Sequence, residues 1–236
     1  MAEGPAQPYP FDYDSNPERF RAARRVVERY GVAGDVHEPI AERFLHEKIH
    51  LALDIGCGEG RLLRALRPLG ITGVGLDRSP VLLAHAPRPT VLGEACSLPF
   101  ADSVFDAAAA VYMLYHLADP LLAIREAHRV LRRGGLLVAV APSRFDSPET
   151  AKWEQFGPST FDAELAPTLV GSIFSGIEVD KWDGPFIQLP DSDGLSQYLV
   201  GRGMSRERAR LVSESAAIHW PLSITKRGAL VYGWKA

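Results

Sequence analysis

The chain has 236 residues, of which 46% are hydrophobic, so it is long enough to bury a full core as one enlarged domain. Its formal net charge of -3 provides no basic surface for nucleic acid, which we therefore exclude as a partner. No apolar run approaches the ~20 residues that span a bilayer, and no signal peptide opens the chain, so we expect no membrane contact and a cytoplasmic location. The cysteines and histidines lack metal-ligand spacing, so we expect no metal.

The first 47 residues are predicted to form an arm followed by two lid helices. Residues 1–15 are rich in proline and aromatic residues, which favours either an arm that folds over a ligand or an anchor on the core. Asn16 and Pro17 then form a helix start, with a cap and proline at the first helical position. We expect this helix to end near Tyr30 and a second helix to run over residues 35–47.

A glycine turn follows the first predicted strand. Residues 51–53 form an apolar run that ends at Asp54, and helical spacing resumes over residues 61–66. Between them lie three alternating glycines, Gly56, Gly58 and Gly60. A strand, a glycine turn and a helix are typical of a nucleotide-binding βαβ unit. A dinucleotide fingerprint would require glycine at position 61, where this chain has Arg61, so a nicotinamide dehydrogenase is the weaker alternative.

A second acidic residue, Asp77, directly follows the next predicted strand, residues 71–76. The D-x-G-x-G-x-G pattern from Asp54 to Gly60, together with Asp77, resembles motif I of the class I S-adenosylmethionine-dependent methyltransferases. The match to the type 11 methyltransferase domain continues to about residue 141. It implies an α/β, Rossmann-like doubly wound sheet of seven strands, mostly parallel with an antiparallel last strand, plus a helical lid and cap.

The resemblance also implies roles for individual residues. Asp54 would accept from the donor's amino group, Asp77 from both ribose hydroxyls, and the three glycines would let the backbone approach the methionine tail. After the strand 90–92, Glu94 stands where the family has the aspartate that contacts the adenine amino group. The implied donor-binding residues are Asp54, Gly56, Cys57, Gly58, Gly60, Asp77, Arg78, Glu94, Ala95, Cys96 and Tyr112.

Several of these residues also have structural interpretations. Asp54 and Asp77 can serve as helix caps, because acidic side chains accept from the first backbone N–H groups of a helix. Arg78 stacks on adenine in one interpretation and is a solvated side chain in the other. Cys57 and Cys96 are also small apolar residues suited to a core.

His116 is the candidate general base. It follows the fourth strand, predicted over residues 107–111, where the donated methyl would point, and histidine takes up a proton near neutral pH. The alternative is a structural hydrogen bond to a loop. A capped helix is then predicted over residues 121–131, with 132–135 as its C-terminal end, before a fifth strand over residues 136–140.

The resemblance weakens after residue 142, and the added segments carry the prediction about the acceptor. We predict strands over residues 178–182 and 229–235, and helices over 193–201 and 205–218. Within the methyltransferase domain, 48–236, residues 48–141 form the donor-binding core and residues 142–176 and 184–222 form cap segments. The first cap region and the strand after it are rich in aromatic residues, namely Phe145, Trp153, Phe156, Phe161, Phe174, Trp182 and Phe186. At least half should fill the core, and the others favour a small, largely apolar or aromatic acceptor.

The sequence thus predicts an enzyme that transfers a methyl group from S-adenosylmethionine to a small molecule, such as a secondary metabolite. The reaction is an in-line displacement that leaves S-adenosylhomocysteine. The main alternative is a protein that binds S-adenosylmethionine without methyl transfer, either a cofactor-assisted cyclase or a binding module. The sequence indicates neither the acceptor atom nor the oligomeric state.

Overall fold

The computed structural model describes residues 17–154, 158–214 and 218–236, and the predicted arm, residues 1–15, lies outside these ranges. The chain divides into two compact units. Unit 1 consists of Met1–Gly34, Phe145–Pro158 and Trp182–Arg227. Unit 2 consists of Asp35–Arg144, Ser159–Lys181 and Gly228–Ala236. None of the helices in the described part of the chain combines the length and apolar character that crossing a membrane requires.

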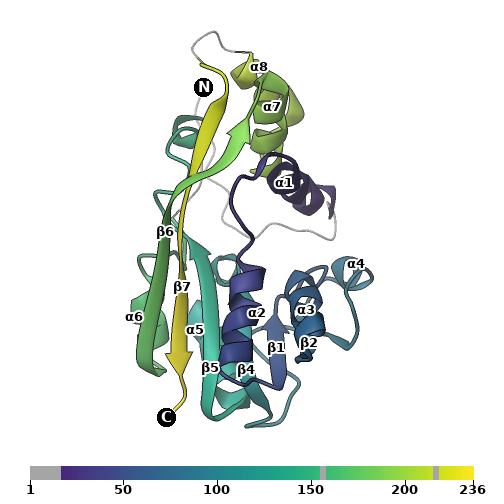
Figure 1. Cartoon of the computed structure of the whole chain (residues 1–236), viewed down its shortest axis with the longest axis vertical. Coiled ribbons are helices and arrows are strands. Elements are labelled where there is room, and N and C mark those ends of the chain that lie inside the picture. Colours follow the sequence, from purple (N-terminus) through teal and green to yellow (C-terminus); the bar gives the residue numbers. More distant parts are fainter. Residues whose placement is uncertain (1–16, 155–157, 215–217) are drawn as a thin grey trace. The chain divides into compact units, whose positions relative to one another are not determined.

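The strands form one seven-stranded sheet in the order β3-β2-β1-β4-β5-β7-β6 (Figure 1). Strands β3, β2, β1, β4 and β5 pair in parallel, and β7 runs antiparallel to β5. The predicted Rossmann-like sheet is confirmed. The strands are β1 (Leu51–Ile55), β2 (Thr72–Asp77), β3 (Thr90–Leu92), β4 (Phe105–Val111), β5 (Leu131–Pro142), β6 (Ser175–Leu189) and β7 (Leu222–Trp234).

Helices cover both faces of the sheet in unit 2, with α2 and α3 on one face and α5 and α6 on the other (Figure 1). Apolar side chains of the strands and of α5 and α6 form a continuous core, in which Leu53, Leu137 and Phe161 are fully buried. The helical elements of this unit are α2 (His37–His46), α3 (Arg61–Leu66), η1 (Arg67–Leu69), α4 (Pro80–Leu83), η2 (Leu114–His116), α5 (Pro120–Val130) and α6 (Ala166–Gly171).

Two helices in unit 2 begin with side-chain caps, as predicted for the helix over residues 121–131. The Ser79 hydroxyl accepts from the Leu82 backbone N–H at 3.2 Å, and the Asp119 carboxylate accepts from Leu121 at 3.0 Å. Each cap satisfies a backbone donor that the first helical turn leaves unpaired. Each is followed by a proline, whose fixed φ suits the first helical position.

The predicted helix end over residues 132–135 is wrong. Helix α5 ends at Val130, and Leu131 already pairs with Phe105 at the start of β5. Residues 132–135 form an irregularity in that strand, because the next pair joins Ala107 to Leu136. Burial explains the early end of the helix, since Leu131 is fully buried and needs an extended backbone to reach its partner on β4.

Unit 1 has its own apolar core, built on helices α1 (Pro17–Tyr30), α7 (Ser192–Gly201) and α8 (Arg206–Ser213), with η3 (Ala151–Trp153). Helices α1 and α7 approach closely at Gly201, where a Cβ atom would lie 2.8 Å from the Ala23 Cα. The predicted segment 142–176 contributes to both units, whereas 184–222 lies in unit 1. Their role as a cap stays a prediction.

A buried polar cluster joins three segments of unit 1. The Lys226 ammonium donates to Asp146 at 2.9 Å, to the Ser147 hydroxyl at 2.9 Å and to the Tyr198 hydroxyl at 3.1 Å. Burial opposes the charge on Lys226, but Tyr198 and Asp146 raise its pKa above the ordinary value. The cluster therefore holds a charged amine inside this unit, and that charge depends on the acid beside it.

Candidate active site

The glycine turn between β1 and α3 has a backbone that only glycine adopts easily. Gly56, Gly58 and Gly60 have φ values of 69°, 54° and 77°, all in the left-handed region. A Cβ atom on Gly60 would also lie 2.6 Å from Cδ of Pro87. The turn is fixed to β2, because the backbone N–H groups of residues 56 and 57 both donate to the Leu76 carbonyl. It therefore presents backbone rather than side chains at the carboxyl end of β1.

Two buried acids flank this turn. Asp54 on β1 is 3% exposed and Asp77 on β2 is 8% exposed. The Asp77 carboxylate accepts from the backbone N–H of Gly58 at 2.7 Å and from that of Ser79 at 2.9 Å. Each of its oxygens keeps further acceptor capacity. Asp54 is not a helix cap, because Gly60 occupies the N-cap position of α3.

Burial has a strong effect on the titration of this pair. It raises the pKa of Asp54 to about 8, and the charge of Asp77 adds to the shift. Burial, with the charges of Asp54 and Asp77, also raises the pKa of the Cys57 thiol far above its ordinary value. Cys57 is therefore neutral at physiological pH, in agreement with a small apolar role. A cation placed beside Asp54 would favour ionisation of that acid.

The predicted adenine contacts lie on the rim that follows β2 and β3. Arg78 and Glu94 are both well exposed, and the Arg78 Nε lies 4.0 Å from the Glu94 Oε1. Ala95 is buried and Cys96 is half-buried. Burial, followed by the charge of Glu94, raises the pKa of the Cys96 thiol. The structure brings Arg78 and Glu94 together, whereas stacking of Arg78 and Cys96 on adenine stays a prediction.

The segment after β4 carries Tyr112 and His116. Tyr112 has a φ of 53°, and its backbone N–H donates to the Val140 carbonyl at 3.1 Å. A non-glycine residue in this conformation stores on the order of 1–3 kcal/mol of strain, a feature that clusters at functional sites. The His116 ring lies against Tyr115, with centroids 4.4 Å apart. The role of His116 as a base stays a prediction.

The aromatic residues of the predicted cap region occupy different environments. Phe161 and Phe174 are buried in the core of unit 2, whereas Phe145 is 62% exposed. Trp153 packs against the core of unit 1, and Phe156 lies outside the described residues. The prediction of a largely apolar or aromatic acceptor therefore depends only on those aromatic residues that are not buried in a core.

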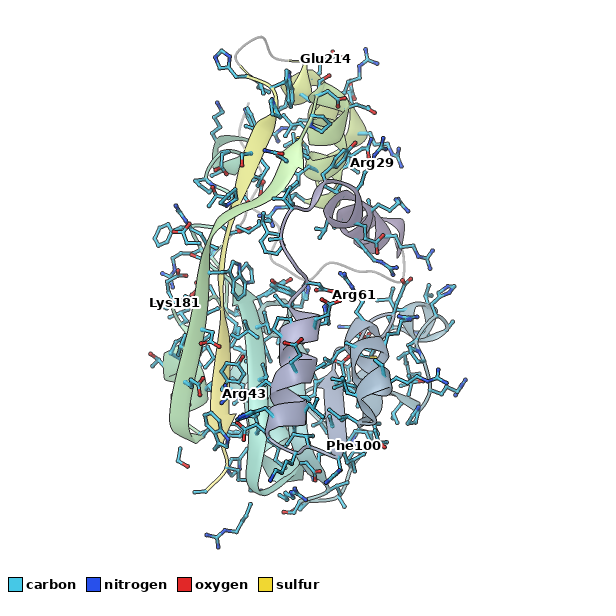
Figure 2. The ribbon with its side chains drawn as sticks, viewed as in Figure 1. Arg29, Arg43, Arg61, Phe100, Lys181 and Glu214 are labelled. Carbon is cyan, nitrogen blue, oxygen red and sulfur yellow. The ribbon has the colours of Figure 1, made fainter. Side chains whose placement is uncertain are left out.

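One contact was missed by the sequence analysis. The His37 ring at the start of α2 lies 2.6 Å from the carboxylate of Asp35, which also forms an ion pair with Arg61 at 2.8 Å. Figure 2 labels Arg61 near the start of α3. The Asp-x-His spacing was the available signal, but only His116 was interpreted as a base. Within the described ranges, no group of three or more metal-ligating side chains could hold a metal ion.

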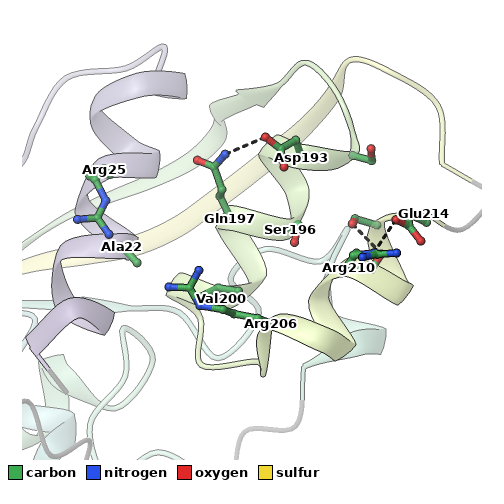
Figure 3. A pocket seen from close by; sticks show the side chains of 11 residues that line it. Ala22, Arg25, Asp193, Ser196, Gln197, Val200, Arg206, Arg210 and Glu214 are labelled. Atoms are coloured by element: carbon green, nitrogen blue, oxygen red, sulfur yellow. Dashed lines mark hydrogen bonds and ion pairs between the residues drawn. The ribbon is translucent and has the colours of Figure 1, made fainter. Parts of the chain in front are cut away.

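Unit 1 contains a separate cavity of about 710 Å³, lined by residues of α1, α7 and α8 (Figure 3). Two of its polar side chains are already paired, since Gln197 donates to Asp193 at 3.3 Å and Arg210 to Glu214 at 2.9 Å. None of the predicted site residues lines this cavity.

The fold and the glycine turn with its two acids are those of the class that the sequence predicted. Comparisons with known proteins agree with that class. The methyltransferase domain family matches residues 53–139. The chain is 31% identical over 194 residues to the 2-phytyl-1,4-naphtoquinone methyltransferase of Nostoc punctiforme, covering 76% of this chain and 78% of that protein. The chain belongs to the class I S-adenosylmethionine-dependent methyltransferases.

Two solved structures have the same fold. One is an S-adenosylmethionine-dependent methyltransferase from Thermotoga maritima, with a TM-score of 0.60 and 19% identity over 95% of this chain and 98% of that chain. The other is the [4+2]-cyclase SpnF, with a TM-score of 0.63 and 19% identity over 98% of this chain and 99% of that chain. This chain is thus an enzyme that methylates a small molecule from S-adenosylmethionine, and the dehydrogenase alternative does not hold.

Proposed function

We propose that this enzyme methylates a small aromatic acceptor of the quinol type, the reduced form of a 2-alkyl-1,4-naphthoquinone. The observation that carries this proposal is its 31% identity to a 2-phytyl-1,4-naphtoquinone methyltransferase over most of both chains. The net charge of -3 disfavours a nucleic-acid acceptor. A cytoplasmic location belongs to the same proposal.

The residues of the glycine turn fit S-adenosylmethionine. The left-handed backbone at three glycines suits a ligand that must approach the main chain. Asp77 is held by two backbone N–H groups and keeps acceptor capacity for two ribose hydroxyls. Asp54 is a buried acid with a raised pKa, and the ammonium group of the donor is the kind of partner that would ionise it.

Each of these residues would bind a different part of the donor. Asp54 would bind its ammonium group, Asp77 its ribose, and the rim residues Glu94 and Ala95 its adenine. When bound, S-adenosylmethionine supplies an electrophilic methyl group on a sulfonium. The chain's own contribution is to hold that group in line with the acceptor, a positioning effect that accounts for much of the rate in such reactions.

Donor binding and methyl transfer are tested separately. Asp77→Ala removes a charged acceptor from two hydroxyls, so it should weaken S-adenosylhomocysteine binding by at least about tenfold, because each such bond contributes about 1.5 to 3 kcal/mol. Calorimetry measures this change. Transfer of a labelled methyl group to the reduced naphthoquinone tests the acceptor. Wild-type protein that binds S-adenosylhomocysteine but leaves the quinol unlabelled would contradict the proposed acceptor.

A further inference from the structure

The contact between His37 and Asp35 has the geometry of a histidine held by a carboxylate. The His37 Nδ1 lies 2.6 Å from the Asp35 Oδ1, and the other oxygen of Asp35 lies 2.8 Å from the Arg61 guanidinium. The His37 side chain is 13% exposed, so it is largely packed but still reaches the surface. A carboxylate that accepts from Nδ1–H fixes the tautomer and leaves Nε2 with a free electron pair.

The pair lies close to the donor-binding turn. Arg61 is the first residue of α3 and directly follows Gly60. Its ion pair with Asp35 ties the start of α2 to the start of α3, and the two helices pack together. In sheets of this type, ligands bind at the carboxyl ends of the strands, the edge at which the turn after β1 lies. The His37 ring therefore lies next to the region where the methyl donor binds in the proposed function.

The surroundings of the pair keep Asp35 charged. Burial opposes this charge, but the hydrogen bond and charge of His37, together with the charge of Arg61, hold the pKa of Asp35 below its ordinary value. In the part of the chain that the structure describes, the charged group that contacts the pair is Arg61 on α3, through Asp35. An ionised Asp35 stabilises the imidazolium that forms when His37 accepts a proton.

We propose that His37 is the general base of methyl transfer and that Asp35 and Arg61 are positioning residues that hold its ring. This inference rests on the proposed function. The acceptor's hydroxyl proton passes to the His37 Nε2 while an electron pair of the acceptor forms the new bond to the methyl carbon. The electrons of the broken carbon–sulfur bond remain on sulfur, which becomes a neutral thioether. The imidazolium later releases its proton to water.

The experiment compares three variants of the full-length enzyme. His37→Gln removes the base, and Asp35→Asn removes the charge that holds it. His46→Gln is the matched control, because it lies on the same helix with a side chain that is 83% exposed. For each variant, kcat and KM for methyl transfer to the reduced 2-alkyl-1,4-naphthoquinone are measured across pH, and S-adenosylhomocysteine affinity is measured by calorimetry.

We expect His37→Gln to lower kcat by about 100-fold or more while S-adenosylhomocysteine affinity stays unchanged. Asp35→Asn should lower kcat and move the acid limb of its pH profile to lower pH, because the imidazolium loses a neighbouring negative charge. A purely structural pair would lower thermal stability without moving that limb. His46→Gln should behave as wild type.

A wild-type kcat for His37→Gln would overturn the inference. If S-adenosylhomocysteine affinity falls at the same time, the pair is a donor contact instead. If wild-type enzyme does not methylate the quinol, the proposed acceptor fails. The role of His37 is then tested by nitrogen NMR, which identifies its tautomer in the S-adenosylhomocysteine complex. An Nδ1–H tautomer supports the inference, whereas an Nε2–H tautomer refutes it.

Discussion

Asp54 should make the stability of the enzyme fall as pH rises. Its folded-state pKa is about 8, against an ordinary value of 3.8, because it is buried next to Asp77. The folded protein therefore holds a proton on Asp54 that the unfolded chain has already released. Its contribution to stability is fully present below about pH 4 and is lost as pH rises toward about 8.

The size of this effect follows from proton linkage. Between these pH values the folded state binds nearly one more proton than the unfolded state, so the free energy of unfolding falls by about 1.4 kcal/mol per pH unit. Asp54→Asn has a similar shape and cannot ionise. Relative to this variant, wild type should lose roughly 2.5 kcal/mol between about pH 5.5 and about pH 7.5.

Urea unfolding of the ligand-free enzyme at about pH 5.5, 6.5 and 7.5, followed by circular dichroism, measures this difference. The control is Glu42→Gln, which removes an exposed carboxylate from α2 and should keep the wild-type slope. If Asp54→Asn and wild type lose stability in parallel across this range, Asp54 is ionised in the folded protein and the reasoning fails.

Two other predictions concern the glycine turn and the buried cluster of unit 1. Gly60→Ala should lower stability and S-adenosylhomocysteine affinity more than Gly70→Ala does. Both positions have left-handed backbone, but of the two only Gly60 has a neighbour in the way of a Cβ atom. Equal losses for the two variants in calorimetry and thermal melts would contradict the clash. Lys226→Met should destabilise the protein by about 1 to 3 kcal/mol, since it removes the nearer of the two cations beside the buried Asp146 and leaves Arg202 at 3.7 Å. Adding Asp146→Asn should recover part of that loss in urea unfolding, and a further loss would refute this account.

The donor half of the molecule could be predicted from sequence because its signals are local. Glycines at alternate positions and an acid at each strand end, Asp54 and Asp77, mark β1, the turn and β2 within a short stretch of chain. Caps such as Ser79 act within one helical turn, so they too are visible in sequence. The same holds for short parallel strands, whose continuous apolar runs indicate burial on both faces.

The features that were missed depend on contacts or on backbone conformation. The length of β6 was underestimated because most of its residues are exposed and because Gly184 and Pro185 interrupt its apolar pattern. The strain at Tyr112 depends on backbone geometry that composition does not encode. The pair formed by Asp35 and His37 is local, but its link to the glycine turn is made through Arg61, which is distant in the sequence.

The division of unit 1 among separated stretches of chain has a consequence for its biosynthesis. Helix α1 packs on α7, but residues 31–191 must be synthesised between them. At about 5 to 20 residues per second, the ribosome needs roughly 8 to 30 seconds to complete that interval. During this time the apolar face of α1, including Val26, cannot pack on α7, because α7 has not yet been synthesised. Among the described helices, α1 is therefore made early but is one of the last to reach its native contacts.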